Sequence, residues 1–128
     1  GLTYVAYCFA DVQGYSKFGS YVGNGNVDGT FCYTGMKPSF VMVKKTSATN
    51  NFVITDNKRD SFNDDATSYL LANDSGVEGT GLNFDLLSNG FKLKSNSGGT
   101  NTSGATYIYM AFAEAPLVGS NNVPATAR

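Results

Sequence analysis

Histidine is absent from this chain of 128 residues. Because histidine is the commonest general base and the commonest metal ligand in proteins, its absence excludes Ser-His-Asp and Cys-His nucleophilic systems. Tryptophan is absent too, and only two cysteines are present. A zinc site would therefore need carboxylates to complete its ligands. The sequence argues against the enzyme classes that depend on a histidine base, and it suggests no cofactor.

Charged residues are scarce, at 15% of the chain, and the formal net charge is only −1. The adjacent basic pairs are limited to Lys44–Lys45 and Lys58–Arg59, so we expect no groove that follows nucleic-acid phosphates. No apolar run approaches the ~20 residues that span a bilayer, and no signal-peptide pattern is visible. We expect neither a nucleic-acid partner nor membrane insertion. The first residue is Gly1 rather than Met, which leaves open a fragment or a processed product.

Glycine, asparagine, serine and threonine are abundant instead, and every aromatic residue is Tyr or Phe. Such a composition has poor helix propensity and good turn chemistry, while Tyr and Phe favour strands. Apolar runs recur about every ten residues between turn clusters, which is typical of an all-β sandwich or barrel. Asn24-Gly25 and Asn89-Gly90 are dipeptides favoured at type I′ turns, and the second predicts a hairpin. Strands are expected at 3–11, 16–22, 29–34, 39–45, 52–56, 68–72, 82–87, 90–95 and 105–114.

The chain nearly repeats itself at its two ends. Residues 3–11 match residues 106–114, with Tyr4 opposite Tyr107 and Phe9 opposite Phe112. Both segments are apolar on both alternating faces, which an ordinary half-wet sheet does not allow. We expect both to be strands covered on two sides, inside the domain or by another copy. The candidate subunit-interface residues are Tyr4, Tyr107, Tyr109, Leu117, Val118 and Val123.

The two cysteines, Cys8 and Cys32, are interpreted as buried thiols rather than as a disulfide, with Cys8 as small apolar filler. Asp11 and Glu114 end the two matched segments. A carboxylate pair across a cleft would suit a glycosidase, but we favour strand ends that meet solvent.

The charged loop at 56–65 carries four aspartates, Asp56, Asp60, Asp64 and Asp65. Calcium prefers such oxygen-rich loops, yet EF-hand spacing is missing and basic residues interrupt the cluster, so a solvated loop is favoured. If the domain binds glycans, this loop and the loop at 96–103 are the first candidates. The candidate surface-binding residues are Lys58, Arg59, Asp60, Asn63, Asn96 and Asn101.

An ordered series of motifs resembles a domain widespread in tailed bacteriophages, especially marine ones, where it occurs in virion structural proteins and tail fibres. The motifs lie at residues 7–10, 14–21, 23–25, 33–35, 37–41, 88–93 and 107–114, from Tyr-Cys-Phe-Ala to Tyr-Ile-Tyr-Met-Ala-Phe-Ala-Glu. The chain departs from that pattern at Met36, where an aromatic is usual, and at Phe52, where Trp is common. The resemblance implies a concanavalin-like or jelly-roll β-sandwich near the C-terminus of longer chains, and it carries no catalytic residues.

We therefore expect an all-β, two-sheet β-sandwich of about nine strands over residues 1–116. Residues 117–128 form either a frayed end or an extended arm that packs on a neighbour. The expected function is a non-enzymatic phage virion protein on the particle surface. It is an oligomeric tail-fibre or appendage domain, homotrimeric, that contacts other virion proteins and host surface glycans. A capsid decoration or head-fibre protein and a glycan depolymerase remain as alternatives.

Overall fold

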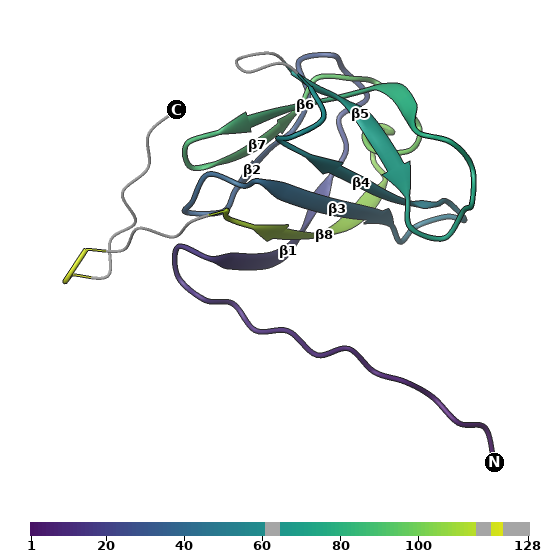
Figure 1. Cartoon of the computed structure of the whole chain (residues 1–128). Helices are drawn as coiled ribbons and strands as arrows, with labels where there is room; N and C mark the ends of the chain where they lie inside the picture. The colour runs from purple at the N-terminus through teal and green to yellow at the C-terminus, as the bar shows by residue number, and fades with distance from the viewer. Residues whose placement is uncertain (61–64, 115–118, 122–128) are drawn as a thin grey trace.

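The computed structural model describes residues 1–60, 65–114 and 119–121 (Figure 1). In this part of the chain every regular element is a β-strand, so the predicted all-β class is confirmed. The strands are β1 (Ser16–Val22), β2 (Phe31–Tyr33), β3 (Phe40–Lys45), β4 (Phe52–Asp56), β5 (Ala66–Leu71), β6 (Gly79–Leu87), β7 (Gly90–Leu93) and β8 (Thr106–Phe112). Each strand that we expected after residue 15 overlaps one of these.

The eight described strands form one antiparallel sheet in the order β1-β8-β3-β4-β5-β6-β7-β2. β5 pairs with both β4 and β6 and thereby joins the two halves of the sheet, which curls over on itself. Its two edge strands, β1 and β2, come close together at one end. There the hydroxyl of Thr30, just before β2, donates a 2.8 Å hydrogen bond to the carbonyl oxygen of Val22 in β1. The architecture is a nearly closed sheet, and the expected separation into two sheets is not seen at the level of strand pairing.

The core lies between the two halves of the curled sheet. Val43 and Tyr109 point inward from β3 and β8, and Phe84 and Phe91 point inward from β6 and β7; all four are buried. The ring of Phe91 meets the ring of Tyr109 edge-on, with centroids 5.2 Å apart. Alternate residues of these strands thus meet across the core. This alternation is the period-two pattern from which the strands were predicted.

The hairpin of β6 and β7 is confirmed, with Leu87 paired with Gly90 around a two-residue turn. Its expected turn chemistry is wrong, however, because Gly90 is not among the glycines with positive φ. Gly25 does have a φ of 69°, but its loop connects β1 and β2, which are not neighbours in the sheet. Asn24-Gly25 therefore marks a loop and not a hairpin corner.

The expected strand at residues 3–11 is wrong. Residues 1–11 form no strand, and they extend away from the sheet (Figure 1). A hairpin does begin here, since Val12 and Ser16 exchange backbone hydrogen bonds of 2.9 and 3.1 Å. The next hydrogen-bonded pair would join Ala10 and Phe18, but side chains replace it. The Asp11 carboxylate accepts the Phe18 amide at 2.9 Å, and the Ser16 hydroxyl donates to the Ala10 carbonyl at 2.8 Å.

Both cysteines are free thiols. Cys32 is buried as expected, but Cys8 is exposed, so its interpretation as buried filler is wrong. The reason is the same diversion of the chain that leaves residues 1–10 outside the sheet. The proposed C-terminal arm at 117–128 lies mostly outside the described residues.

Candidate functional site

The outward side of β1, β8, β3 and β4 carries a continuous apolar surface. Directly paired residues of antiparallel strands share a face, so the register places Phe18, Met110, Met42 and Ile54 in one row across the four strands. Flanking rows add Phe112 opposite Phe40, and Ile108 beside Phe52 across Lys44. We call this surface the outer face; its apolar residues are Phe18, Phe40, Met42, Phe52, Ile54, Ile108, Met110 and Phe112.

The two sides of β8 are both apolar, as the sequence predicted, but the structure covers only one of them. Tyr107 and Ala111 point into the core and are wholly buried, whereas Ile108 on the outer face is 48% exposed. The same division holds in β3, where Val41 is buried and Met42 is only half-buried. The expected cover on both sides is therefore missing within the described part of a single chain.

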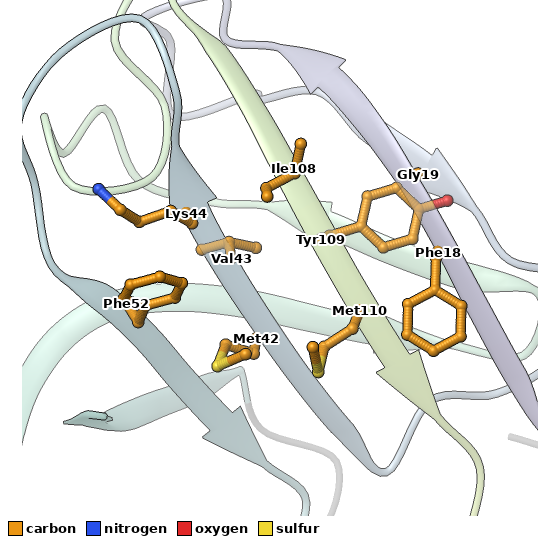
Figure 2. Close-up of a pocket in the computed structure, with 9 residues that line it drawn as sticks. All are labelled: Phe18, Gly19, Met42, Val43, Lys44, Phe52, Ile108, Tyr109 and Met110. Carbon is orange, nitrogen blue, oxygen red and sulfur yellow. The ribbon is translucent and has the colours of Figure 1, made fainter. Parts of the chain in front are cut away.

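A shallow groove of about 280 Å³ runs along this surface. Figure 2 shows Phe52, Met42, Met110 and Phe18 projecting from neighbouring strands to line it. Small-molecule sites typically measure about 300–1,000 Å³ and enclose their ligand, so this groove suits protruding side chains better than a ligand. The groove offers apolar contact, and among its described lining residues only Lys44 is charged.

The ammonium group of Lys44 is bound to the backbone at the edge of the groove and does not point into the groove as a reactive group. Its ammonium donates a 2.6 Å hydrogen bond to the carbonyl oxygen of Asn50 and lies 5.3 Å from the ring centroid of Phe52. The charge therefore sits at the rim of the outer face while the aliphatic stem adds to its apolar area.

One corner of the outer face is an aromatic cluster where β1 begins and β8 ends. The ring of Phe112 meets Phe18, Phe40 and Tyr15 with centroids 5.8–6.1 Å apart. Phe9 joins this cluster from the N-terminal segment, stacked on Phe18 at 5.8 Å and edge-on to Phe112 at 5.9 Å. These spacings are those of favourable aromatic pairs, so the N-terminal segment is attached to the outer face by one ring.

Residues 1–10, which we call the N-terminal arm, expose large apolar side chains. Leu2, Tyr4, Val5 and Tyr7 are 77–84% exposed. Single exposed apolar residues are ordinary, but a contiguous apolar segment of this kind indicates an interaction site. Together with the outer face, the arm gives the molecule two apolar surfaces that meet at Phe9.

The basic residues predicted for a surface-binding loop already have partners within the chain. Arg59 donates to the carboxylates of Asp56 and Glu78 at 2.7 and 2.9 Å, and Lys58 forms an ion pair with Glu114. Recruiting Arg59 to an external ligand would break both of its bonds. Arg59 therefore serves to hold the base of this loop against Asp56 and Glu78.

Asp60 anchors the same loop to β5. Its carboxylate accepts hydrogen bonds of 2.9–3.1 Å from the amides and hydroxyls of Thr67 and Ser68. Burial raises the pKa of this carboxyl, but the bonds from Ser68 and Thr67 outweigh it, and the net pKa is lowered. Asn63 and Asp64 lie outside the described residues. Within the described ones, no cluster of three or more potential metal ligands occurs.

Asn101 is not the surface residue that we expected, because its side chain is fully buried. Its amide nitrogen donates to Asn24 Oδ1, Asn26 O and Ser95 O at 2.8–3.0 Å, and its Oδ1 accepts the Asn24 amide at 2.9 Å. Asn101 therefore ties the 23–26 loop to the 95–101 loop. Asn96 is exposed.

The predicted interface residues divide into three groups. Tyr4 is exposed on the N-terminal arm, while Tyr107 and Tyr109 are buried in the core and face away from any partner. Leu117, Val118 and Val123 lie outside the described residues. Because both sides of β8 are apolar, alternation alone could not tell which side faces inward, and the outward set is Ile108, Met110 and Phe112.

Asp11 and Glu114, the carboxylates considered as a catalytic pair, each face a lysine. Hydrogen bonding to Lys17 lowers the pKa of Asp11, and hydrogen bonding to Lys58 lowers the pKa of Glu114. A glycosidase needs one carboxyl whose pKa is raised so that it can act as an acid. Neither residue has that environment here.

The fold and the outer face define a β-sheet module with a bare apolar surface. The chain belongs to the family described as a domain of unknown function, DUF7483, whose model matches residues 1–116. That match spans the N-terminal arm together with the sheet. Among curated proteins and solved structures, none matches the chain. The described residues include no helix able to cross a membrane.

Proposed function

We propose that the protein is a non-enzymatic structural module whose copies associate through the outer face. Its place, following the resemblance of its motifs, is the surface of a bacteriophage particle. There it serves as an oligomeric, homotrimeric tail-fibre or appendage domain directed at host surface glycans. The observation that carries self-association is the outer face itself, eight large apolar side chains on four adjacent strands. Ile108 and Phe52 are exposed and the other six are only half-buried, although Phe9 and Tyr15 pack on one corner of the face.

Energetics favour cover of the whole outer face rather than of one residue. Full burial of one large apolar side chain contributes about 1.5–3 kcal/mol, while association costs roughly 4–15 kcal/mol in lost freedom of motion. Several of these side chains must be covered together to exceed that cost. A partner surface that spans the rows from Phe18 to Ile54 meets this requirement.

The groove's chemistry supports a structural role. Its lining is apolar, its one charged lining residue is committed to Asn50, and Asp11 and Glu114 are held in their ionised forms by lysines. The curled sheet, with its halves facing each other across one core, is also compatible with a jelly-roll or concanavalin-like sandwich, which we propose as the finer description of the fold.

The test is the molar mass in solution, measured by size-exclusion chromatography with light scattering under reductant, so that disulfides through Cys8 do not contribute. We expect oligomers at micromolar concentration. Ile108→Glu should shift the protein toward monomer, because it places a charge on the outer face. The new carboxylate lies directly opposite Lys44, so the variant keeps a favourable cross-strand pair in the monomer.

The matched control is Val77→Glu, which makes the same change at a 96% exposed position outside the strands. This variant should assemble like the wild type. A wild-type protein that stays monomeric throughout the micromolar range would overturn self-association. Labelling the chain on intact particles then separates a tail or fibre position from a position in the capsid shell, which would indicate a decoration protein instead.

A further inference from the structure

Over residues 5–9 the N-terminal arm has a bulky side and a small side. Along its extended backbone Val5, Tyr7 and Phe9 alternate with Ala6 and Cys8, and successive side chains of an extended chain point to opposite sides. Residues 1–10 carry no charged side chain. Residues 5–9 are therefore suited to an apolar surface that receives Val5, Tyr7 and Phe9 while Ala6 and Cys8 remain toward solvent. Farther out, Leu2 and Tyr4 lie on the same side as Ala6.

Phe9 indicates which surface that is. Its ring stacks on Phe18 and meets Phe112, both of which belong to the outer face, so one residue of the bulky side already contacts a surface of this kind. The sequence repeat supports the match. In the alignment of residues 3–11 with 106–114, Val5 and Tyr7 correspond to Ile108 and Met110, the outward residues of β8.

The N-terminal arm runs out from its own sheet and does not lie along it (Figure 1). The Asp11 carboxylate binds the Phe18 amide and the Lys17 ammonium, and the Ser16 hydroxyl binds the Ala10 carbonyl. These contacts fix the chain where the arm begins, and the arm then runs out from the sheet (Figure 1). Because the arm leaves the sheet beyond these contacts, a second copy can receive it while they stay intact.

The dimensions and charges also fit. Residues 2–9 in extended form reach roughly 26 Å at about 3.3 Å per residue, and four strands spaced about 4.8 Å apart span roughly 14 Å between the first and the last. The arm is therefore long enough to cross β1, β8, β3 and β4. Neither the arm nor the centre of the outer face places a charge in the contact, so no buried unpaired charge opposes it.

We propose that the N-terminal arm of one copy lies on the outer face of a second copy, with Val5, Tyr7 and Phe9 against the rows around Met42 and Met110. The inference rests on the proposed self-association and names the segment that provides the contact. Phe9, which touches the corner of its own outer face in the single chain, passes to the same corner of the second copy or bridges the two.

The test compares two aspartates on opposite sides of the arm in the full-length chain. Tyr7→Asp places a charge on the bulky side, and Ala6→Asp places the same charge one residue away on the small side. Both positions are exposed in the single chain, so neither variant should affect folding, which circular dichroism checks. Sedimentation velocity under reductant should show the dissociation constant raised about 30-fold or more by Tyr7→Asp and nearly unchanged by Ala6→Asp.

A mixing experiment tests whether the arm of one copy binds the outer face of another. The alternatives are an arm that binds its own sheet and two outer faces that pack directly on each other. Tyr7→Asp keeps an intact outer face, and Ile108→Glu keeps an intact arm. Each variant alone should be largely monomeric, and the two together should form a one-to-one complex. An arm that folds onto its own sheet, or two outer faces packed directly on each other, would give no recovery on mixing, and either result overturns the proposal.

The outcomes also distinguish failure of self-association from failure of the arm as the contacting segment. A wild type that never associates defeats the proposed function. A wild type that associates, together with Tyr7→Asp and Ala6→Asp variants that associate equally well, defeats only the assignment of the arm. Equal loss in both arm variants contradicts the bulky-side orientation stated here.

Discussion

The carbonyl oxygen of Cys32 occupies the space that a side chain on Gly90 would need. A Cβ atom built on Gly90 would lie 2.1 Å from that oxygen. Gly90 begins β7, which pairs with the short edge strand β2 that carries Cys32. The glycine is required by the close approach of two backbones and not by a left-handed turn.

Gly90→Ala should therefore destabilise the protein strongly. Overpacking typically costs about 1–3 kcal/mol and occasionally more, and the obstructing atom here is backbone, so we expect about 3 kcal/mol in urea unfolding. Gly90→Asn should be at least as harmful, although asparagine tolerates a left-handed turn. In Gly98→Ala the new atom is 3.7 Å from Thr102 Oγ1, and the change should stay within about 0.5 kcal/mol. If Gly90→Asn left the stability unchanged, glycine would be needed at this position for a left-handed turn and not for the close approach of the two backbones.

The two thiols should differ sharply in reactivity. Burial raises the pKa of Cys32 to about 12, so only about one thiol in 10⁴ is ionised at pH 8, and the thiolate is the reactive form. Cys8 is exposed on the arm. Titration with a disulfide reagent at pH 8 should detect one fast thiol per native chain and two after unfolding. Mass spectrometry should locate the fast label on Cys8, and a slow Cys8 would mean that the arm is paired within the chain.

Asn101→Ala should destabilise the domain although it lies in a polar loop sequence. The substitution removes the side-chain contacts of Asn101 with four partner atoms, among them the carbonyl oxygens of Asn26 and Ser95. Each net hydrogen bond contributes about 0.5–1.5 kcal/mol, so we expect a loss of about 3 kcal/mol. Asn96→Ala, at an exposed position of the same loop, is the matched control and should change stability by less than about 0.5 kcal/mol. Similar stability of the two variants would contradict the role of Asn101.

Asp60→Asn should lower stability in a manner that depends on pH. The pKa of Asp60 is lower in the folded chain than its ordinary value of 3.8, so ionisation stabilises the fold above that value. The contribution is lost as the pH falls through the folded pKa. Hydrogen bonds to charged groups contribute about 1.5–3 kcal/mol, and we expect a deficit of about 2 kcal/mol at pH 7. Urea unfolding at pH 7, 4 and 2.5 should show the deficit shrinking with acidity; a constant deficit would contradict the assignment.

Most of the sheet could be predicted from alternation and from the Gly/Asn/Ser-rich segments between the strands, although the turn type expected at Asn24-Gly25 and Asn89-Gly90 is wrong. Burial alternates throughout β8 and along β3 as far as Lys44, and the limits of both strands lie within a few residues of the expected ones. The N-terminal arm could not be predicted in this way, because its pattern is nearly that of β8. What separates them is tertiary: β8 pairs with β1 and β3, whereas the side chains of Asp11 and Ser16 stop the arm's hairpin after one bridge.

The sequence predicted that the last strand is apolar on both sides, but not which side forms the outer face. The doubly apolar character of residues 105–114 could be read directly, but the choice of Tyr107 and Tyr109 as interface residues was wrong because both point inward. When both sides of a strand are apolar, alternation does not say which side meets the core. Asn101 shows a related limit, since a polar residue in a Gly/Ser-rich loop is buried here by its bonds to Asn24, Asn26 and Ser95.

The three methionines provide the most direct test of a covered outer face. Met42 and Met110 face each other across β3 and β8, whereas Met36 is 1% exposed in the core and serves as the internal control. Oxidation to the sulfoxide follows exposure and can be followed residue by residue by mass spectrometry. If copies associate through the outer face, Met42 and Met110 should oxidise faster in dilute monomer than in the assembled protein, with Met36 slow in both. Equal oxidation rates of Met42 and Met110 in monomer and assembly would contradict the account.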